Sequence, residues 1–114
     1  HVKFGHGKGL FTPGELVKVA LAGCGALSSQ FAVESALGEG HGATITVDGA
    51  YDADTDSYTS FEEHVAVDAT AADLTDEDAD RLSERITRHI NKRCTVKHTL
   101  EKETPVRFDV TVRH

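Results

Sequence analysis

Residues 12–38, TPGELVKVALAGCGALSSQFAVESALG, predict one long helix around which the rest of the chain is arranged. Thr12 is a favoured N-cap residue, and Pro13 suits the first helical position because its missing N–H would have no partner there. Glu15 in the first turn complements the helix dipole, and Gly38 is a typical residue to end a helix in a left-handed conformation. The middle of the stretch is apolar almost all round, which predicts a helix buried on every side.

This apolar run is not expected to cross a membrane. Lys18 interrupts it, and Ser28, Ser29, Gln30 and Glu34 follow, whereas a membrane span needs about 20 consecutive apolar residues. The whole chain has 114 residues, of which 39% are hydrophobic and 27% are charged. We therefore expect a single domain over residues 1–114, a cytoplasmic location and no membrane partner.

Cys24 lies inside the predicted helix, between Gly23 and Gly25. It shares a helix face with the apolar residues Leu16, Ala20, Leu27 and Phe31. A glycine in a helix interior costs about 1 kcal/mol relative to alanine. The close approach of another helix, or of a ligand to the thiol, would offset that cost. The alternative is a small core cysteine beside a tight helix crossing, because free cysteine is among the most buried residue types.

A β-hairpin is predicted after this helix. Ile45, Val47 and Tyr51 alternate with polar residues, and a polar turn follows at residues 52–57. The second strand has Phe61, Val65 and Val67 in one phase, but Glu63 falls on the same apolar side. We expect Glu63 to be exposed near the end of the hairpin or to face a partner subunit.

Two further helices and a strand complete the predicted order. Thr75 caps an amphipathic helix whose apolar stripe is Ala79, Leu82, Ile86 and Ile90. A short helix is expected between Cys94 and Pro105. Residues 105–113 then alternate apolar and polar side chains, as in a half-buried strand. The class is therefore α+β with an antiparallel sheet, and the long apolar helix needs a second copy of the chain to bury it.

The charge balance argues against a nucleic-acid partner. The chain carries 19 acidic and 12 basic residues, a net charge of −7, whereas nucleic-acid binding needs a basic surface. No cofactor motif is present. Cys94 and His98 are spaced i, i+4 and could begin a metal site with His89 and Glu101, but we favour no metal, since no established ligand motif accompanies them.

The two cysteines, Cys24 and Cys94, lie seventy positions apart and form no CxxC motif. From the residues alone they are two unrelated core thiols, a structural disulfide or a redox-active pair. Within a helix, a structural disulfide at Cys24 is the least favoured of the three.

Two segments resemble the OsmC/Ohr family (osmotically inducible protein C and organic hydroperoxide resistance). TPGELVKVALAGCGALSS is similar to the family's central helix with its first cysteine. RHINKRCTVKHTLEKETPVRFDV is similar to its second motif, in which a helix leads into the second cysteine. The resemblance covers residues 4 to 113 and implies an OsmC-like fold: an intertwined homodimer built around two long central helices. It also implies that this chain lacks the N-terminal strands of the family.

The resemblance further implies a thiol-dependent peroxidase that reduces organic hydroperoxides. Cys24 would attack the hydroperoxide and become a sulfenic acid, and Cys94 would condense with it to a disulfide. A dithiol, such as a protein-bound lipoyl group, would reduce the disulfide. The apolar surroundings of Cys24 favour an organic hydroperoxide over hydrogen peroxide.

Two positions depart from the family pattern. Gly14 stands where characterised peroxidases of the family place a glutamate, and Glu15 is the weak substitute one position later. The family's arginine has no counterpart that carries over to this sequence, and a buried cysteine without a cation is expected to have a raised pKa. The alternative function is therefore a non-catalytic OsmC-like protein that binds a small hydrophobic ligand at its dimer interface.

Overall fold

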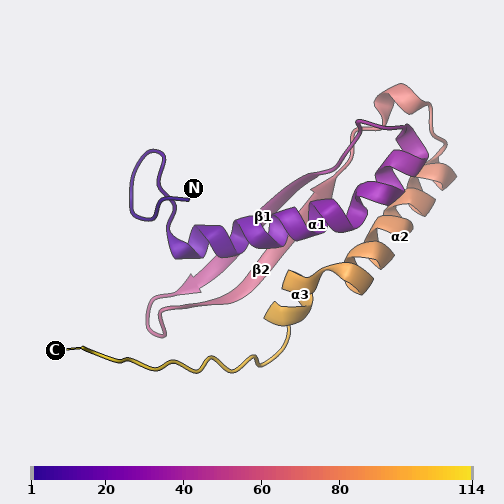
Figure 1. Ribbon diagram of the computed structural model, residues 1–114. Coiled ribbons are helices and arrows are strands. Elements are labelled where there is room, and N and C mark those ends of the chain that lie inside the picture. The colour runs from indigo at the N-terminus through magenta and orange to yellow at the C-terminus, as the bar shows by residue number, and fades with distance from the viewer. Residues whose placement is uncertain (1, 114) are drawn as a thin grey trace.

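A computed structural model gives the structure of residues 2–113. Its elements are α1 (Pro13–Leu37), β1 (Thr44–Asp52), β2 (Ser57–Ala66), the 3-10 helix η1 (Thr70–Ala72), α2 (Asp76–Arg93) and α3 (Thr95–Leu100). β1 and β2 form an antiparallel hairpin with an irregularity between Ala50 and Tyr51. α1 lies across this hairpin, and α2 packs beside the C-terminal half of α1 (Figure 1). The predicted α+β class is confirmed.

α1 begins and ends at the predicted residues, but the left-handed helical conformation predicted for Gly38 is wrong. Thr12 and Glu15 form a capping box: the Thr12 N–H donates to Glu15 Oε1 at 2.9 Å, and the Glu15 N–H donates to Thr12 Oγ1 at 3.2 Å. At the other end Gly38 has φ 100° and ψ 166°, a backbone that favours glycine but is extended rather than left-handed helical. The Gly38 N–H donates to the Glu34 carbonyl at 2.8 Å.

By length and composition α1 is a candidate membrane span. It has 25 residues, a mean hydropathy of 1.5 over its most apolar window, and 28% of that window is buried. A core helix has the same properties, so these two criteria do not distinguish the alternatives. The packing of α1 favours a core helix, because α1 contacts the hairpin, α2 and α3 of its own domain.

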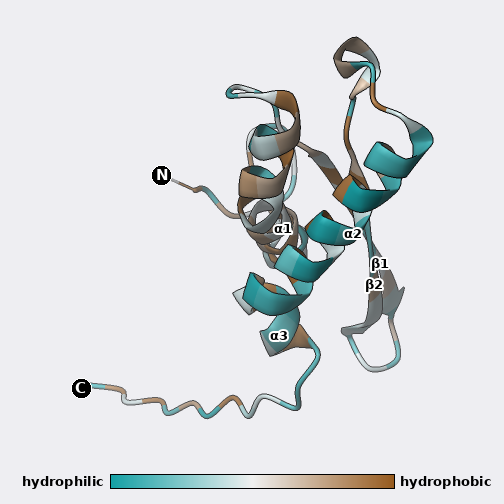
Figure 2. Cartoon of the chain, turned by 90° about the vertical axis from the view of Figure 1, so that its right-hand side faces the viewer, coloured by the Kyte–Doolittle hydropathy of each residue, from teal (hydrophilic) through white to brown (hydrophobic). Residues whose placement is uncertain are grey.

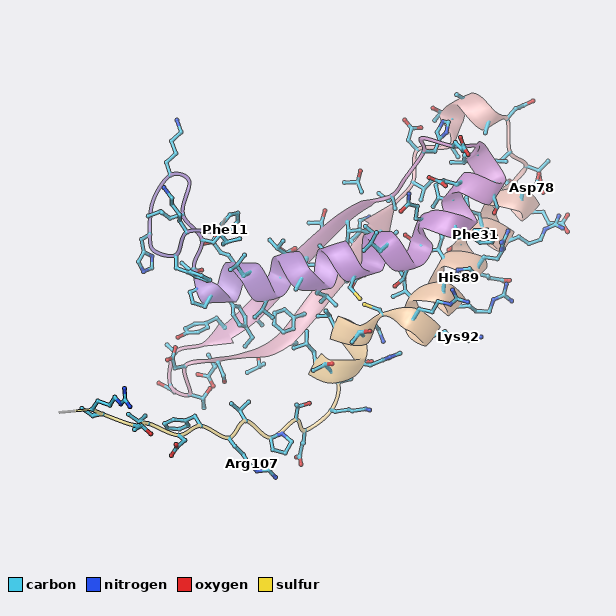
Figure 3. The ribbon with its side chains drawn as sticks, in the orientation of Figure 1. Phe11, Phe31, Asp78, His89, Lys92 and Arg107 are labelled. Atoms are coloured by element: carbon cyan, nitrogen blue, oxygen red, sulfur yellow. The ribbon has the colours of Figure 1, made fainter. Side chains whose placement is uncertain are left out.

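A small core forms where α1 and α2 meet. Its buried members are Leu21, Ala32 and Val33 of α1, Leu82, Ile86 and Ile90 of α2, and Cys94. Three residues of the predicted stripe on α2 are thus buried, whereas Ala79 is exposed. The outer face of α2 is hydrophilic (Figure 2). At the edge of the contact the Phe31 ring stacks on His89 with 6.4 Å between ring centroids (Figure 3).

The prediction that α1 is buried on every side is wrong for a single chain. Val19, Leu27 and Phe31 are 52%, 75% and 68% exposed. The chain's radius of gyration is 17.9 Å, whereas about 13 Å is expected for a compact domain of this length. Within residues 2–113, a two-stranded sheet and one long helix are the main elements that pack against α1, so the opposite side of the helix lacks a cover.

The prediction of a half-buried strand over residues 105–113 is also wrong. The segment is extended, but it joins no sheet of the described chain and leads away from the domain (Figure 1). Its four apolar residues, Val106, Phe108, Val110 and Val112, are 73% to 88% exposed. Alternation of this kind is typical of a strand with a partner edge and one covered face. A single chain supplies neither to this segment.

Glu63 is found neither at the hairpin end nor in solvent, contrary to the prediction of an exposed side chain. It stands on the inner face of β2, in the same phase as Phe61 and Val65, and its carboxylate abuts the backbone of α1 at Gly25. A Cβ atom on Gly25 would collide with Glu63 Oε1, whereas a Cβ on Gly23 would meet nothing within 4 Å. The close approach predicted at this glycine pair is therefore made by a strand side chain at Gly25 alone.

These two glycines make a matched test of the packing. In a single chain, Gly23→Ala should raise the free energy of unfolding by up to about 1 kcal/mol, because alanine is the better helix former and no atom lies within 4 Å of the added methyl group. Gly25→Ala should stabilise the protein less than Gly23→Ala does, because the added methyl group must displace the Glu63 carboxylate. Urea denaturation at one fixed protein concentration measures both changes. An equal increase in both variants would show that Glu63 does not pack on α1.

Candidate functional site

The fold brings the two cysteines together. α1 passes the point where α2 ends and α3 begins, and the two sulfur atoms of the chain, in yellow, lie in this crossing (Figure 3). Cys94 is both the C-cap of α2 and the N-cap of α3, so the chain turns at this residue. Its N–H still donates to the Ile90 carbonyl at 3.0 Å. Cys24 is half-buried, Cys94 is fully buried, and both are free thiols.

The surroundings of Cys24 favour its thiolate. Burial is the largest single influence and opposes ionisation, but hydrogen bonds from the Cys94 thiol and from the N–H groups of Val96 and Thr95 act the other way. The Ser28 hydroxyl adds a weaker contribution. Together they lower the pKa of Cys24 below its ordinary value. The expectation that Cys24 would have a raised pKa is wrong, because amide and thiol donors take the place of a cation.

Cys94 has the opposite character. Burial raises the pKa of Cys94 to about 11, and the neighbouring Cys24 and the charge of Glu63 act in the same direction. The Lys97 N–H opposes this shift. Cys94 is thus the thiol that keeps its proton and donates it in the hydrogen bond, while Cys24 is the acceptor. The two side chains are chemically identical, but their positions in the fold give them different pKa values.

A cavity of about 250 Å³ opens between β2 and α3, and neither cysteine lines it. It is lined by Leu21 of α1, Tyr58, Thr59, Ser60, Phe61 and Glu63 of β2, and Lys97, Leu100 and Glu101 at α3. Lys97 Nζ contacts the Glu101 carboxylate oxygens at 2.9 and 3.0 Å. Among the described residues, Glu63 Oε1 is the buried side-chain oxygen without a hydrogen-bond partner. The cavity therefore has mixed walls, with apolar Leu21, Phe61 and Leu100 among polar residues, and Glu63 contributes one unsatisfied buried acceptor to its rim.

The structure does not bring Glu15 to the cysteine pair. Glu15 lies nine positions before Cys24 in a regular helix, about 13.5 Å along the axis, and its carboxylate is held in the capping box. Its hydrogen bonds with Thr12 lower the pKa of Glu15. Gly14 has its own packing reason: a Cβ there would lie 2.7 Å from the Tyr58 hydroxyl. Tyr58 thus occupies the space beside the position where the family pattern has glutamate.

The alternative of a metal site at Cys94 and His98 finds no ligand set in the described structure. The two residues are in helical register, with the His98 N–H donating to the Cys94 carbonyl at 3.0 Å. The His98 ring, however, hydrogen-bonds to the Asn91 carbonyl. Over residues 2–113, no three Cys, His, Asp or Glu side chains cluster closely enough to hold a metal ion.

Sequence reasoning missed Glu63 and Lys97 as members of this site. The signal for Glu63 is present in the sequence, because this residue breaks the apolar phase of its strand. The contact of Glu63 with α1 could not be inferred, since nothing in the sequence pairs position 63 with Gly25. Lys97 lies on a short helix whose rotation about its axis is set only by the turn at Cys94.

Comparison with known proteins agrees with this arrangement. The chain matches the OsmC-like protein family over residues 5–109. It is 38% identical over 102 residues to uncharacterised proteins of Mycobacterium tuberculosis and Mycobacterium bovis, with 90% of this chain and 73% of each relative covered. The family match includes both helix motifs that carry the cysteines. This chain therefore belongs to the OsmC-like protein family.

Proposed function

We propose that this protein is a thiol-dependent peroxidase that reduces organic hydroperoxides through a two-cysteine cycle. The Cys24 thiolate attacks the hydrogen-bearing oxygen of the hydroperoxide, and the O–O bond breaks. The sulfur becomes a sulfenic acid, and the alkoxide leaves with the bonding electrons and takes up a proton to form the alcohol. Cys94 then attacks the Cys24 sulfur, hydroxide departs as water, and a disulfide forms.

The observation that carries this proposal is the unequal pair of free thiols at the crossing of α1 with the α2–α3 junction. A peroxidatic cysteine must be a thiolate and must be reachable, and Cys24 has a lowered pKa and is half-buried. A resolving cysteine must be near and must stay a thiol until needed, and Cys94 is adjacent, buried and has a pKa of about 11.

The surroundings also favour an organic substrate. Leu21, Phe61 and Leu100 line the cavity between β2 and α3, so an alkyl or aryl group would bury apolar surface there. The disulfide must be reduced by an external dithiol, for which a protein-bound lipoyl group is a suitable candidate. We place the cycle in the cytoplasm, where reducing conditions return both cysteines to thiols.

The proposal predicts a defined thiol stoichiometry. One equivalent of cumene hydroperoxide should remove two free thiols from the reduced wild-type protein. In Cys94→Ser it should remove one thiol and leave a sulfenic acid on Cys24 that dimedone traps. In Cys24→Ser the remaining thiol should react at least about 100-fold more slowly, because Cys94 is buried and protonated. Thiol counting with time and mass spectrometry of the dimedone adduct measure these outcomes.

Thiols that persist for hours in the wild-type protein would contradict a peroxidase. A non-catalytic protein that binds a small hydrophobic ligand would then be the better account of the apolar cavity. A matched control is the same reaction with hydrogen peroxide, which should be slower because it has no apolar group to bury.

The thiolate of Cys24 predicts a specific pH dependence. The rate of iodoacetamide alkylation at Cys24 should reach half its maximum at a pH below the ordinary cysteine value, since the folded structure lowers this pKa. Cys94→Ala removes the S–H donor and should shift the curve to higher pH. Cys94→Ser keeps a hydroxyl donor and should shift it less. Identical curves for wild type, Ala and Ser would show that Cys94 does not stabilise the thiolate.

We also propose that the functional protein is an intertwined homodimer. The exposed side of α1 is apolar, and residues 105–113 form an extended segment with an apolar face and no partner strand in the described part of their own chain. A second copy of the chain would cover the exposed side of α1 and would offer a sheet edge to residues 105–113. A C2 pairing satisfies both chains with one set of contacts.

This assembly predicts the effect of a charge on α1. Leu27→Glu should convert a dimer to a monomer in sedimentation velocity, because it places a carboxylate in the centre of the covered apolar face. Ala71→Glu on η1 is the control, since it adds the same charge at an exposed site outside the apolar face formed by Val19, Leu27 and Phe31 and should leave the dimer intact. A wild-type protein that sediments as a monomer would contradict the proposal.

A further inference from the structure

The proposed disulfide step poses a problem of proton transfer. Cys94 must lose its proton before its sulfur can attack the sulfenic acid on Cys24. The residue has 0% exposed surface, and its pKa is about 11. Bulk water cannot take the proton directly from a thiol with no accessible surface. An acceptor inside the protein is therefore needed, a requirement that rests on the proposed two-cysteine cycle.

Glu63 is placed to be that acceptor. It reaches from the inner face of β2 to the backbone of Gly25, which directly follows Cys24 in α1. Its Oε1 atom is buried and accepts no hydrogen bond. Its charge is also felt at Cys94. The carboxylate thus has a free acceptor atom next to the helix that holds one cysteine and acts electrostatically on the other.

The cavity connects Glu63 to α3. Glu63 and Lys97 both line it, and Lys97 lies three positions after Cys94, one helical turn along α3. Lys97 is already paired with Glu101 at 2.9 and 3.0 Å, so it leaves the Glu63 carboxylate without a direct salt bridge. A volume of about 250 Å³ has room for a substrate or for water that links donor to acceptor.

We propose that Glu63 takes the proton from the Cys94 thiol during disulfide formation and returns it to the departing hydroxide. The Cys94 sulfur donates its electron pair to the Cys24 sulfur as the S–O bond of the sulfenic acid breaks. Hydroxide leaves with that bond's electron pair and receives the proton from Glu63 as water. Glu63 ends as the carboxylate it was at the start, and no external oxidant or reductant enters the step.

The electrostatics of the cavity support this role. Burial raises the pKa of Glu63, and Lys97 opposes that rise. A carboxylate with a raised pKa is a stronger base than an exposed one, which brings it closer to the thiol that it must deprotonate. The other titratable groups that line the cavity are Tyr58 on β2 and Glu101 after α3, while α1 contributes the apolar Leu21.

The test separates the two chemical steps. Reduced protein is mixed with one equivalent of cumene hydroperoxide, quenched at intervals and analysed by intact mass, which distinguishes the sulfenic acid from the disulfide. In Glu63→Gln the sulfenic acid on Cys24 should accumulate, because its conversion to the disulfide should be about 100-fold slower than in the wild type. Glu62→Gln is the control, because Glu62 is the neighbouring residue on the exposed face of β2 and should behave as wild type.

The pH profile excludes a merely structural effect. In the wild type the rate of disulfide formation should rise with pH through the pKa of Glu63 and then level. In Glu63→Gln it should keep rising toward the pKa of Cys94, which burial holds above its ordinary value, as hydroxide replaces the lost base. A packing defect would instead lower the rate by the same factor at every pH. Glu63→Asp retains a carboxylate and should recover part of the rate.

Each outcome bears on one proposal. Equal disulfide rates in Glu63→Gln, Glu62→Gln and wild type would overturn the role of Glu63 while leaving the peroxidase intact. If the wild type forms no sulfenic acid, the peroxidase fails, and diamide then tests Glu63 by itself. Diamide adds to the Cys24 thiolate, and Cys94 must lose its proton to displace the adduct, so Glu63→Gln should again slow disulfide formation about 100-fold.

Discussion

The structure depends on one constraint, the need to cover a long apolar helix in a chain of only 114 residues. A two-stranded sheet is marginal by itself, so β1 and β2 are stable only against the side of α1 that they cover. α2 covers a second side with a narrow stripe of Leu82, Ile86 and Ile90. The remaining side of α1 stays apolar and open, and the C-terminal segment is left extended. The pairing of two chains would cover the open side of α1 and would also give the C-terminal segment a partner.

The same packing produces the asymmetry of the cysteines. α2 packs along α1 and ends at Cys94, where the chain turns to start α3. This turn directs the N–H groups of Thr95 and Val96 toward Cys24. Cys94 itself is enclosed by the crossing and loses all contact with solvent. One geometric feature therefore supplies hydrogen-bond donors to one sulfur and removes water from the other. This lowered pKa arises from the Cys94 thiol and from backbone N–H groups, without a cationic side chain among its causes.

Much of this could be predicted from local patterns. The caps at Thr12 and Thr75, the hairpin alternation and the family motifs predict the elements and their order, because each of these signals acts within a few residues. Features that depend on a distant partner were mispredicted. The alternation at residues 105–113 correctly indicates an extended backbone, but it does not say whether the partner edge belongs to the same chain. The pKa of Cys24 was mispredicted because its donors come from Thr95 and Val96, about seventy positions away.

Glu63 and Gly25 are best understood together. A glycine inside a helix is destabilising by about 1 kcal/mol relative to alanine, and a buried carboxylate oxygen without a partner costs about 1–3 kcal/mol or more. A single substitution at position 25 or position 63 could remove one of these two defects. The two residues are nevertheless linked, because the Glu63 carboxylate fits against α1 only where the helix lacks a Cβ atom. Two interlocking unfavourable features beside Cys24 are consistent with the proposed cycle, because a functional site often gives up stability for chemistry. An apolar side chain at position 63 would pack better, but under the proposed mechanism it would leave the buried Cys94 thiol without an acceptor for its proton.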